Sequence, residues 1–181
     1  AILGIMPKAA EITGGEILLG GTDLLRLSPD ARRRLVGSTC ALIPQDPLTA
    51  LNPSRRIGPQ ITGPLTDILG WDRRRAEARA RALLDEVQVP DAARVLRSYP
   101  HELSGGMRQR VLIAAAFAAE PRLIVADEPT TALDVTVQRE VLRLIARMQA
   151  AHGTALLFVT HDLGVVSKVC RSLSVLYAGL V

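Results

Sequence analysis

Two acidic residues, Asp127 and Glu128, come directly after the apolar run at residues 123–126. A short, continuous apolar run is typical of a strand buried on both faces of a parallel sheet. In open α/β sheets, ligands bind just beyond the carboxyl ends of the strands. The sequence therefore predicts that these carboxylates meet a ligand, or a metal ion bound to one. For an isolated Asp-Glu pair, the alternative is that both acids only cap the next turn.

A serine followed by two glycines opens a predicted helix that continues through Val111. We call these three residues, Ser104, Gly105 and Gly106, the Ser104 turn. Serine is a good N-cap residue, and the glycines leave the first backbone N–H groups without side-chain cover. The N-terminus of a helix carries partial positive charge and attracts anions. We therefore expect an anion site at the Ser104 turn.

Two further polar side chains follow predicted strands. The apolar runs at 39–44 and 155–159 lead into Gln45 and into Thr160-His161-Asp162, again at the carboxyl ends of strands. A single glutamine or histidine after a strand is more often a structural or loop residue than a functional one. The residue types alone therefore leave both interpretations open.

The rest of the chain alternates strands with helices, which favours a mostly parallel sheet. Asp72 is a predicted cap for a helix that ends before Pro90, and Gly153 is a predicted stop for the helix after Asp134. Four prolines are expected to break any long element early in the segment 46–120. A strand is predicted at 13–21, ending in a tight turn at Gly20-Gly21, and a helix starts with Ser28 as its cap and Pro29 as its first residue and runs to Val36. The other predicted elements are helices at 91–97 and ending at Cys170, and a strand at 173–177.

Composition limits the class of protein. At 181 residues and 48% hydrophobic, the chain is long enough for one well-buried core, and we expect a single domain. The net charge of +4 allows a nucleic-acid partner, but the arginines are scattered over predicted helices and aromatics are only 3% of residues. Cys40 and Cys170 form no CxxC pair, which favours core thiols in a reducing compartment. No apolar run approaches the length that crosses a bilayer.

Three motifs together resemble those of ATP-binding-cassette (ABC) ATPases. LSGGMRQR at 103–110, LIVADEPTTALD at 123–134 and VTHD at 159–162 are similar to the signature, Walker B with D-loop, and switch-histidine motifs. YPHE at 99–102 and QDPLTALNP at 45–53 are most similar to the ATPase subunits of bacterial oligopeptide, dipeptide and nickel importers. The resemblance extends from about Leu3 to Gly179.

The resemblance implies an α/β fold of the P-loop NTPase (RecA-like) class, with a mostly parallel sheet flanked by helices and an inserted helical subdomain. The whole chain, 1–181, then reads as a fragment of one ABC ATPase domain. Residues 1–45 are the remnant of the nucleotide-binding core, 46–120 the helical subdomain that ends in the signature motif, and 121–181 the core with Walker B, D-loop and switch histidine.

The resemblance also implies roles in ATP hydrolysis. Asp127 would hold Mg²⁺, and Glu128 would accept a proton from the attacking water. His161 would bond the γ-phosphate and help to position Glu128. Gln45 resembles the Q-loop glutamine, whose side chain reaches the magnesium and the attacking water.

In the family, the residues of the Ser104 turn face away from the ATP of their own subunit. Ser104, Gly105 and Gly106 would therefore grip the γ-phosphate of ATP bound to a partner subunit, with Asp134 bridging the two. The resemblance implies that hydrolysis belongs to a dimer of ATPase subunits, either identical or different.

A phosphate-binding P-loop requires Gly-Lys-Ser/Thr, and neither lysine of this chain follows a glycine. Pro7 precedes Lys8, and Ser167 precedes Lys168. In the family the Walker A motif comes immediately before a segment like AILGIMP at 1–7. The resemblance therefore implies a chain truncated before its first residue, incomplete at the N-terminus and inactive alone.

The full-length protein is expected to be an ATP-binding and ATP-hydrolysing subunit of an ABC importer for peptides or a related small solute. Its implied cofactors are ATP and Mg²⁺. Its implied partners are a second ATPase subunit, transmembrane permease subunits and, indirectly, a solute-binding protein, at the cytoplasmic face of the inner membrane. Two alternatives stay open. One is a non-transport ABC ATPase that acts on nucleic acid or ribosomes, and the other is a non-catalytic interaction fragment.

Overall fold

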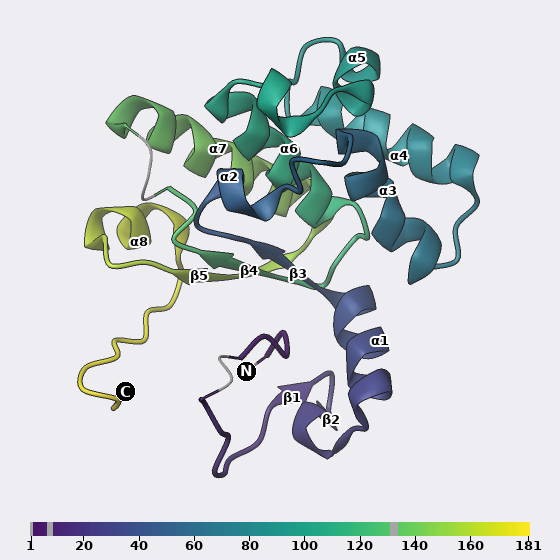
Figure 1. Cartoon of the computed structure of the whole chain (residues 1–181). Coiled ribbons are helices and arrows are strands. Elements are labelled where there is room, and N and C mark those ends of the chain that lie inside the picture. The colour runs from purple at the N-terminus through teal and green to yellow at the C-terminus, as the bar shows by residue number, and fades with distance from the viewer. Residues whose placement is uncertain (1, 7–8, 131–133) are drawn as a thin grey trace.

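A three-stranded parallel sheet forms the centre of the molecule. The computed structural model describes residues 2–6, 9–130 and 134–181, without the side chains of Leu48, Val135 and Lys168. The strands are β3 (Cys40–Ile43), β4 (Leu123–Asp127) and β5 (Ala155–Val159), in the order β3-β4-β5 (Figure 1). The parallel sheet and its three strands confirm the sequence prediction. Lys8 and residues 131–133 of the predicted D-loop lie outside the described residues.

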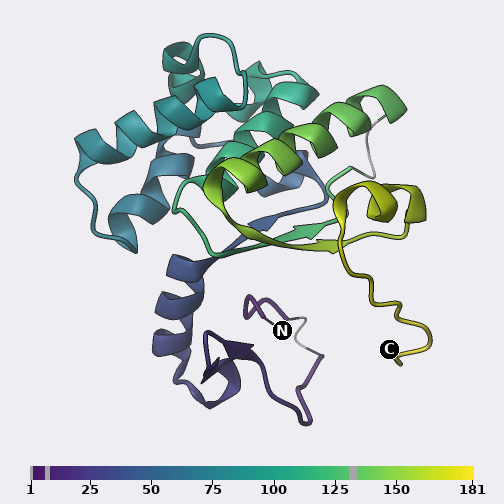
Figure 2. The ribbon, with the colours of Figure 1, turned by 180° about the vertical axis from the view of Figure 1, so that it is seen from behind.

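Two long helices cover one face of this sheet (Figures 1 and 2). They are α6 (Gly105–Phe117) and α7 (Val135–His152). Alternate strand residues point toward them, so Ile43, Ile124 and Ala126 are fully buried in the main core. Helix α6 begins at the predicted cap Ser104, and α7 begins after Asp134 and ends as predicted at Gly153, whose φ of 62° suits glycine.

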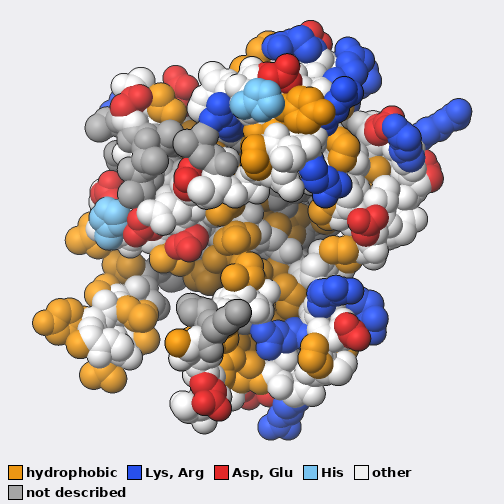
Figure 3. Space-filling model, viewed as in Figure 1, with side chains coloured by type: hydrophobic (Ala, Val, Ile, Leu, Met, Phe, Trp, Pro, Cys, Tyr) orange, Lys and Arg blue, Asp and Glu red, His pale blue; other side chains and the backbone are white. Residues whose placement is uncertain are grey.

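The other face of the sheet is open in the described part of the chain. Leu157 and Val159 of β5 are 43% and 46% exposed, and Val125 of β4 is only partly buried. The prediction of strands buried on both faces is therefore wrong for this structure, because helices pack on one face only. Figure 3 shows hydrophobic side chains in the hollow beneath the sheet.

A group of helices between β3 and β4 packs beside the sheet. It comprises α2 (Pro47–Ala50), α3 (Ile57–Asp67), α4 (Arg73–Glu86), α5 (Ala92–Arg97) and the 3₁₀ turn η2 (Pro100–Glu102). Asp72 caps α4 as predicted, and Asp91 caps α5. The expectation that prolines break any long element is wrong for α3. Pro59 lies in its first turn, where no intrahelical N–H bond is lost, and exposed Pro64 costs α3 one bond.

The N-terminal part forms a small separate layer. A two-residue hairpin pairs β1 (Leu18–Leu19) with β2 (Thr22–Asp23), followed by η1 (Leu24–Arg26) and α1 (Pro29–Thr39). The predicted strand at 13–21 is therefore mostly wrong. Gly20 and Gly21 adopt positive φ values of 58° and 83° and turn the chain back after two residues. The predicted helix start, with Ser28 as the cap and Pro29 as the first helical residue, is confirmed, and α1 continues beyond the predicted end at Val36.

The C-terminal part contains one short helix and an extended tail. Helix α8 (Leu163–Val169) follows β5, and the chain then runs away from the sheet (Figure 1). The predicted strand at 173–177 is wrong, because this segment makes only an isolated bridge between Tyr177 and Leu180 and has no neighbouring strand among the described residues. No helix in the described ranges is long and apolar enough to cross a membrane.

Candidate catalytic site

The backbone of Glu128 is bent sharply where β4 ends. Its φ is 43°, in the left-handed region that non-glycine residues rarely adopt, and its N–H donates to the carbonyl of Val159 on β5 at 2.9 Å. Such a conformation costs on the order of 1–2 kcal/mol and is most common at functional sites. The bend places Glu128 at the carboxyl edge of the parallel sheet, where the sequence predicted a ligand.

Both carboxylate oxygens of Glu128 are bound by side chains from distant parts of the chain. Oε1 accepts from Nδ1 of His161 at 2.9 Å, with the proton on that nitrogen, and Oε2 accepts from Nε2 of Gln45 at 3.1 Å. The three residues follow β4, β5 and β3, which end at the same edge of the sheet. We call Gln45, Glu128 and His161 the Glu128 cluster. The structure therefore brings together the three residues that were predicted to be catalytic.

The hydrogen bond from His161 to Glu128 raises the pKa of His161. The negative charge of Glu128 and, to a smaller extent, that of Asp162 act in the same direction. The His161 side chain is 71% exposed, so solvent screens these interactions. A histidine with a raised pKa is positively charged over a wider pH range, which suits a site for an anion.

Asp127 is the last residue of β4 and is exposed at the same edge. Within the described ranges, no group of three or more His, Cys, Asp or Glu side chains is arranged to hold a metal ion. In proteins, Mg²⁺ keeps several waters and is held by one or two protein oxygens plus substrate phosphates. The Asp127 carboxylate and the Gln45 carboxamide oxygen belong to that donor class.

The Ser104 turn has the predicted cap geometry. The Oγ of Ser104 accepts from the N–H of Met107 at 3.3 Å, and all three residues of the turn are exposed. A Cβ placed on Gly105 or Gly106 would meet no atom within 4 Å. The first N–H groups of α6 therefore lie on an open surface, as the sequence suggested.

Asp134, predicted to bridge two subunits, is the N-cap of α7 in this chain. Its Oδ1 accepts from the N–H groups of Thr136 and Val137, both at 3.0 Å. The capping contact explains the start of α7. It leaves the bridging role as a prediction.

Two glutamines near the Glu128 cluster were not predicted from the sequence. Gln109 of α6 is fully buried, and its Nε2 donates to the carbonyl of Pro129 at 3.0 Å. Its Oε1 has no partner among the described residues. Gln138 of α7 donates to Thr130 and to Asp162. For Gln109, a signal existed, because an amide at 109 shares a helix face with buried Leu112 and Ile113.

Three side chains of types that often bind ligands have structural contacts here. Trp71 packs on the main core, with the guanidinium of Arg75 3.8 Å from its ring centroid. His101 is exposed and stacks on Tyr99. Cys40 is buried as a free thiol, and burial raises its pKa.

These features define the class of protein. Residues 1–131 match the model of the ABC transporter family. Because this match covers more than half of the chain, the chain belongs to the ABC transporter family.

Two curated proteins of Escherichia coli (strain K12) show the range of similarity. The chain is 54% identical to the "Probable D,D-dipeptide transport ATP-binding protein DdpD", over 99% of this chain and 55% of that protein. It is 43% identical to the "Dipeptide transport ATP-binding protein DppD", over 100% of this chain and 55% of that protein. The chain thus spans about half the length of these relatives.

A solved structure has the same fold. It is the dimeric post-hydrolysis state of the ATP-binding cassette MJ0796 bound to ADP and Pi. The TM-score is 0.71 at 27% identity, over 84% of this chain and 65% of that one. The fold is therefore that of an ATP-binding cassette, an α/β fold of the P-loop NTPase class, as the sequence predicted.

Proposed function

We propose that this chain is part of an ATP-hydrolysing subunit that powers an ABC importer of peptides or a related small solute. The observation that carries the proposal is the Glu128 carboxylate, held on one oxygen by His161 and on the other by Gln45. The names of the relatives, which are dipeptide transport ATP-binding proteins, support the solute class.

The chemistry follows from the needs of phosphoryl transfer, which are positioned phosphates, an oriented water and no covalent intermediate. Glu128 would accept a proton from the attacking water. His161 would carry positive charge toward the γ-phosphate while its Nδ1 keeps the base in place. Gln45 would hold the second carboxylate oxygen and the attacking water.

Asp127 and Gln45 would hold Mg²⁺, which supplies positive charge against the developing charge on the phosphates when it is bound. The exposed carboxylate at the end of β4 supports this assignment. The Ser104 turn would bind the γ-phosphate of ATP on a second ATPase subunit, because its N–H groups lie open on the surface. Asp134 would lie at that interface.

We further propose the division of this chain into core residues 1–45 and 121–181 and a helical subdomain at 46–120. Helices α2 to α6 support it, since they fill that segment. The partners of the whole subunit would be permease subunits and, through them, a solute-binding protein, at the cytoplasmic face of the inner membrane.

The test is Glu128→Gln in a longer version of the chain that includes a phosphate-binding loop. This change keeps size and hydrogen bonding but removes the base, so ATP hydrolysis should fall by roughly 10²–10⁴-fold. ATP binding, measured by calorimetry, should survive. Glu77→Gln, on the exposed face of α4, is the control and should hydrolyse ATP at the parental rate. Turnover of the Glu128→Gln variant within a few-fold of the parent would show that Glu128 is not the base.

A further inference from the structure

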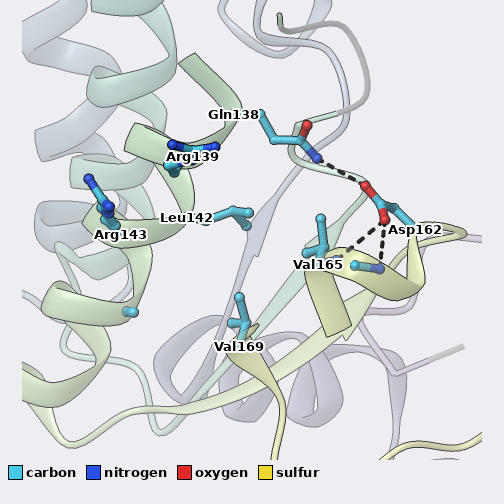
Figure 4. A pocket seen from close by; sticks show the side chains of 9 residues that line it. Gln138, Arg139, Leu142, Arg143, Asp162, Val165 and Val169 are labelled. Atoms are coloured by element: carbon cyan, nitrogen blue, oxygen red, sulfur yellow. Dashed lines mark hydrogen bonds between the residues drawn. The ribbon is translucent and has the colours of Figure 1, made fainter. Parts of the chain in front are cut away.

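The side chain of Gln138 connects the two segments that carry Glu128 and His161. Gln138 lies in the first turn of α7, and its Nε2 donates to Oγ1 of Thr130 at 3.3 Å and to Oδ2 of Asp162 at 3.4 Å. A carboxamide nitrogen has two hydrogens, so both bonds can form at once. Figure 4 shows Gln138 pointing from α7 toward Asp162.

The two acceptors are close neighbours of the catalytic residues in the sequence. Thr130 is two residues after Glu128, and Asp162 directly follows His161. Each acceptor is itself fixed. Thr130 is buried, and Oδ1 of Asp162 accepts from the N–H of Gly164 at 2.8 Å as the cap of α8. A displacement of either acceptor would therefore move the residue beside it.

Apolar packing alone holds α7 and α8 together only loosely at this point. A groove of about 550 Å³ lies between the two helices, with Gln138 at its rim and Leu142, Val165 and Val169 along its apolar part (Figure 4). A groove of this size means that few side chains interlock here. The hydrogen bonds of Gln138 are thus a main constraint on the start of α8.

We propose that Gln138 is a positioning residue that sets the separation between the Glu128 carboxylate and the His161 ring. The proposal rests on the proposed function, because that separation matters for ATP hydrolysis. Where β4 and β5 end, the N–H of Glu128 donates to the carbonyl of Val159 and links the two strands. Gln138 adds a second link between the two segments, at residues that follow Glu128 and His161 in the sequence. Because its donor is neutral, it adds no charge to a site for anions.

The first test uses the 181-residue chain and needs no ATPase activity. The chain has three histidines, and the NMR signal of His161 is identified by its loss in His161→Gln. The pKa of His161 measures its contact with Glu128, and Glu128→Gln gives the value with that contact broken. The test variant is Gln138→Met, which keeps length and helix propensity but removes both donors.

In Gln138→Met, the pKa of His161 should lie closer to the value in Glu128→Gln than to the parental value. Gln149→Met, the same change on the same helix, is the matched control and should keep the parental value. If Gln138→Met does not fold, Thr130→Val removes one acceptor at constant shape and should shift the pKa in the same direction. A parental pKa in the folded Gln138→Met or Thr130→Val variant would overturn the proposal.

The second test uses the longer version of the chain with a phosphate-binding loop. Gln138→Met should lower kcat by roughly 10- to 100-fold, the range expected for a misplaced catalytic group, with KM unchanged. Gln149→Met should keep the parental kcat, and an equal loss in both variants would overturn the positioning role. If the unsubstituted longer chain hydrolyses no ATP, the proposed function is wrong, and the His161 titration still decides whether Gln138 positions that ring.

Discussion

Glu128 combines a strained backbone with a fully bound side chain. Its left-handed φ is unfavourable, but three hydrogen bonds, from its N–H and to its two carboxylate oxygens, fix it in place. A base that is fixed before substrate arrives needs no reorganisation during the reaction. The strain at Glu128 is therefore consistent with a residue selected for position and not for stability.

For single residues, the sequence predicted which side chains lie at the site better than it predicted their hydrogen-bond partners. Asp127, Glu128, Gln45 and His161 could be placed at one sheet edge, because each follows a short apolar run. The helical spacing could place Gln109 on a buried face of α6, but the hydrogen-bond partners of Gln109 and Gln138 could not be predicted. Each depends on which carbonyl or hydroxyl a helix meets after packing, and that contact is set by tertiary structure and leaves no local pattern.

The raised pKa of His161 predicts a pH-dependent contribution to stability. Glu128 stabilises the charged imidazole in the folded state, so the folded pKa lies above the unfolded value near 6.5. The contribution is present in full below that value and is lost as the pH rises through the folded pKa. The parent chain should therefore unfold at a higher temperature than His161→Gln at about pH 6, and this difference should disappear by about pH 9.

Thermal unfolding followed by circular dichroism would measure this difference. The shift should be small, because the His161 side chain is largely exposed and solvent screens the pair. Repeating the comparison in a Glu128→Gln background supplies the control, since the pH-dependent part should then vanish. A difference that grows with pH would contradict the assignment of the contact.

Helix ends were the elements that could be predicted most accurately. The predicted N-caps Ser28, Asp72 and Ser104 all accept backbone N–H bonds in the structure, because capping is a local interaction between neighbouring residues. The arginines were harder to interpret. Expected on solvated faces, several bind helix C-termini instead. Arg79 donates to carbonyls at the end of α6, and Arg110 donates to the carbonyl of Val87 after α4.

The start of α6 gives a test of the proposed trans role. In the longer version of the chain, Ser104→Arg should leave nucleotide affinity of the monomer within a few-fold of the parent and prevent ATP-driven dimerisation. The physical reason is steric, since a long side chain would cover the open N–H groups of the Ser104 turn. Light scattering with ATP in a Glu128→Gln background measures the dimer.

Loss of the cap alone must be separated from this effect. Ser28→Arg removes a serine cap from α1 by the same change, and it should still dimerise. Parental dimerisation of Ser104→Arg would refute the trans role.

For the molecule as a whole, the fold class could be predicted from the sequence, but the exposure of the sheet could not. A continuous apolar strand predicts a packed layer on each face of the sheet. In β5 alternate residues are exposed instead, because helices α6 and α7 lie on one side only. Periodicity reports what a strand can bury, and the number of layers present decides what is buried. The strand predicted in the tail at 171–181 does not form, since the tail has no neighbouring strand to pair with among the described residues.

The open sheet face predicts self-association of the 181-residue chain. Leu157 and Val159 are both exposed on the open face of β5, and exposed apolar patches favour protein contacts. Light scattering should show association that increases with concentration and weakens in the double variant Leu157→Thr, Val159→Thr. Leu163→Thr, on exposed α8, should weaken it less. Equal effects of the two changes would mean that the sheet face is not the contact.

The last prediction concerns nucleotide binding by the chain as it stands. No Gly-Lys-Ser/Thr occurs in these 181 residues, so no lysine and backbone cradle of that kind surround the β- and γ-phosphates. Asp127 and Glu128 then contribute negative charge, and His161 is the positively charged side chain beside Glu128. The negative charge disfavours binding of a polyanion. Calorimetric titration with Mg²⁺-ATP should therefore show weak binding or none, and no steady release of phosphate. Micromolar binding, or phosphate release that disappears on Glu128→Gln, would mean that other residues of this chain hold the phosphates.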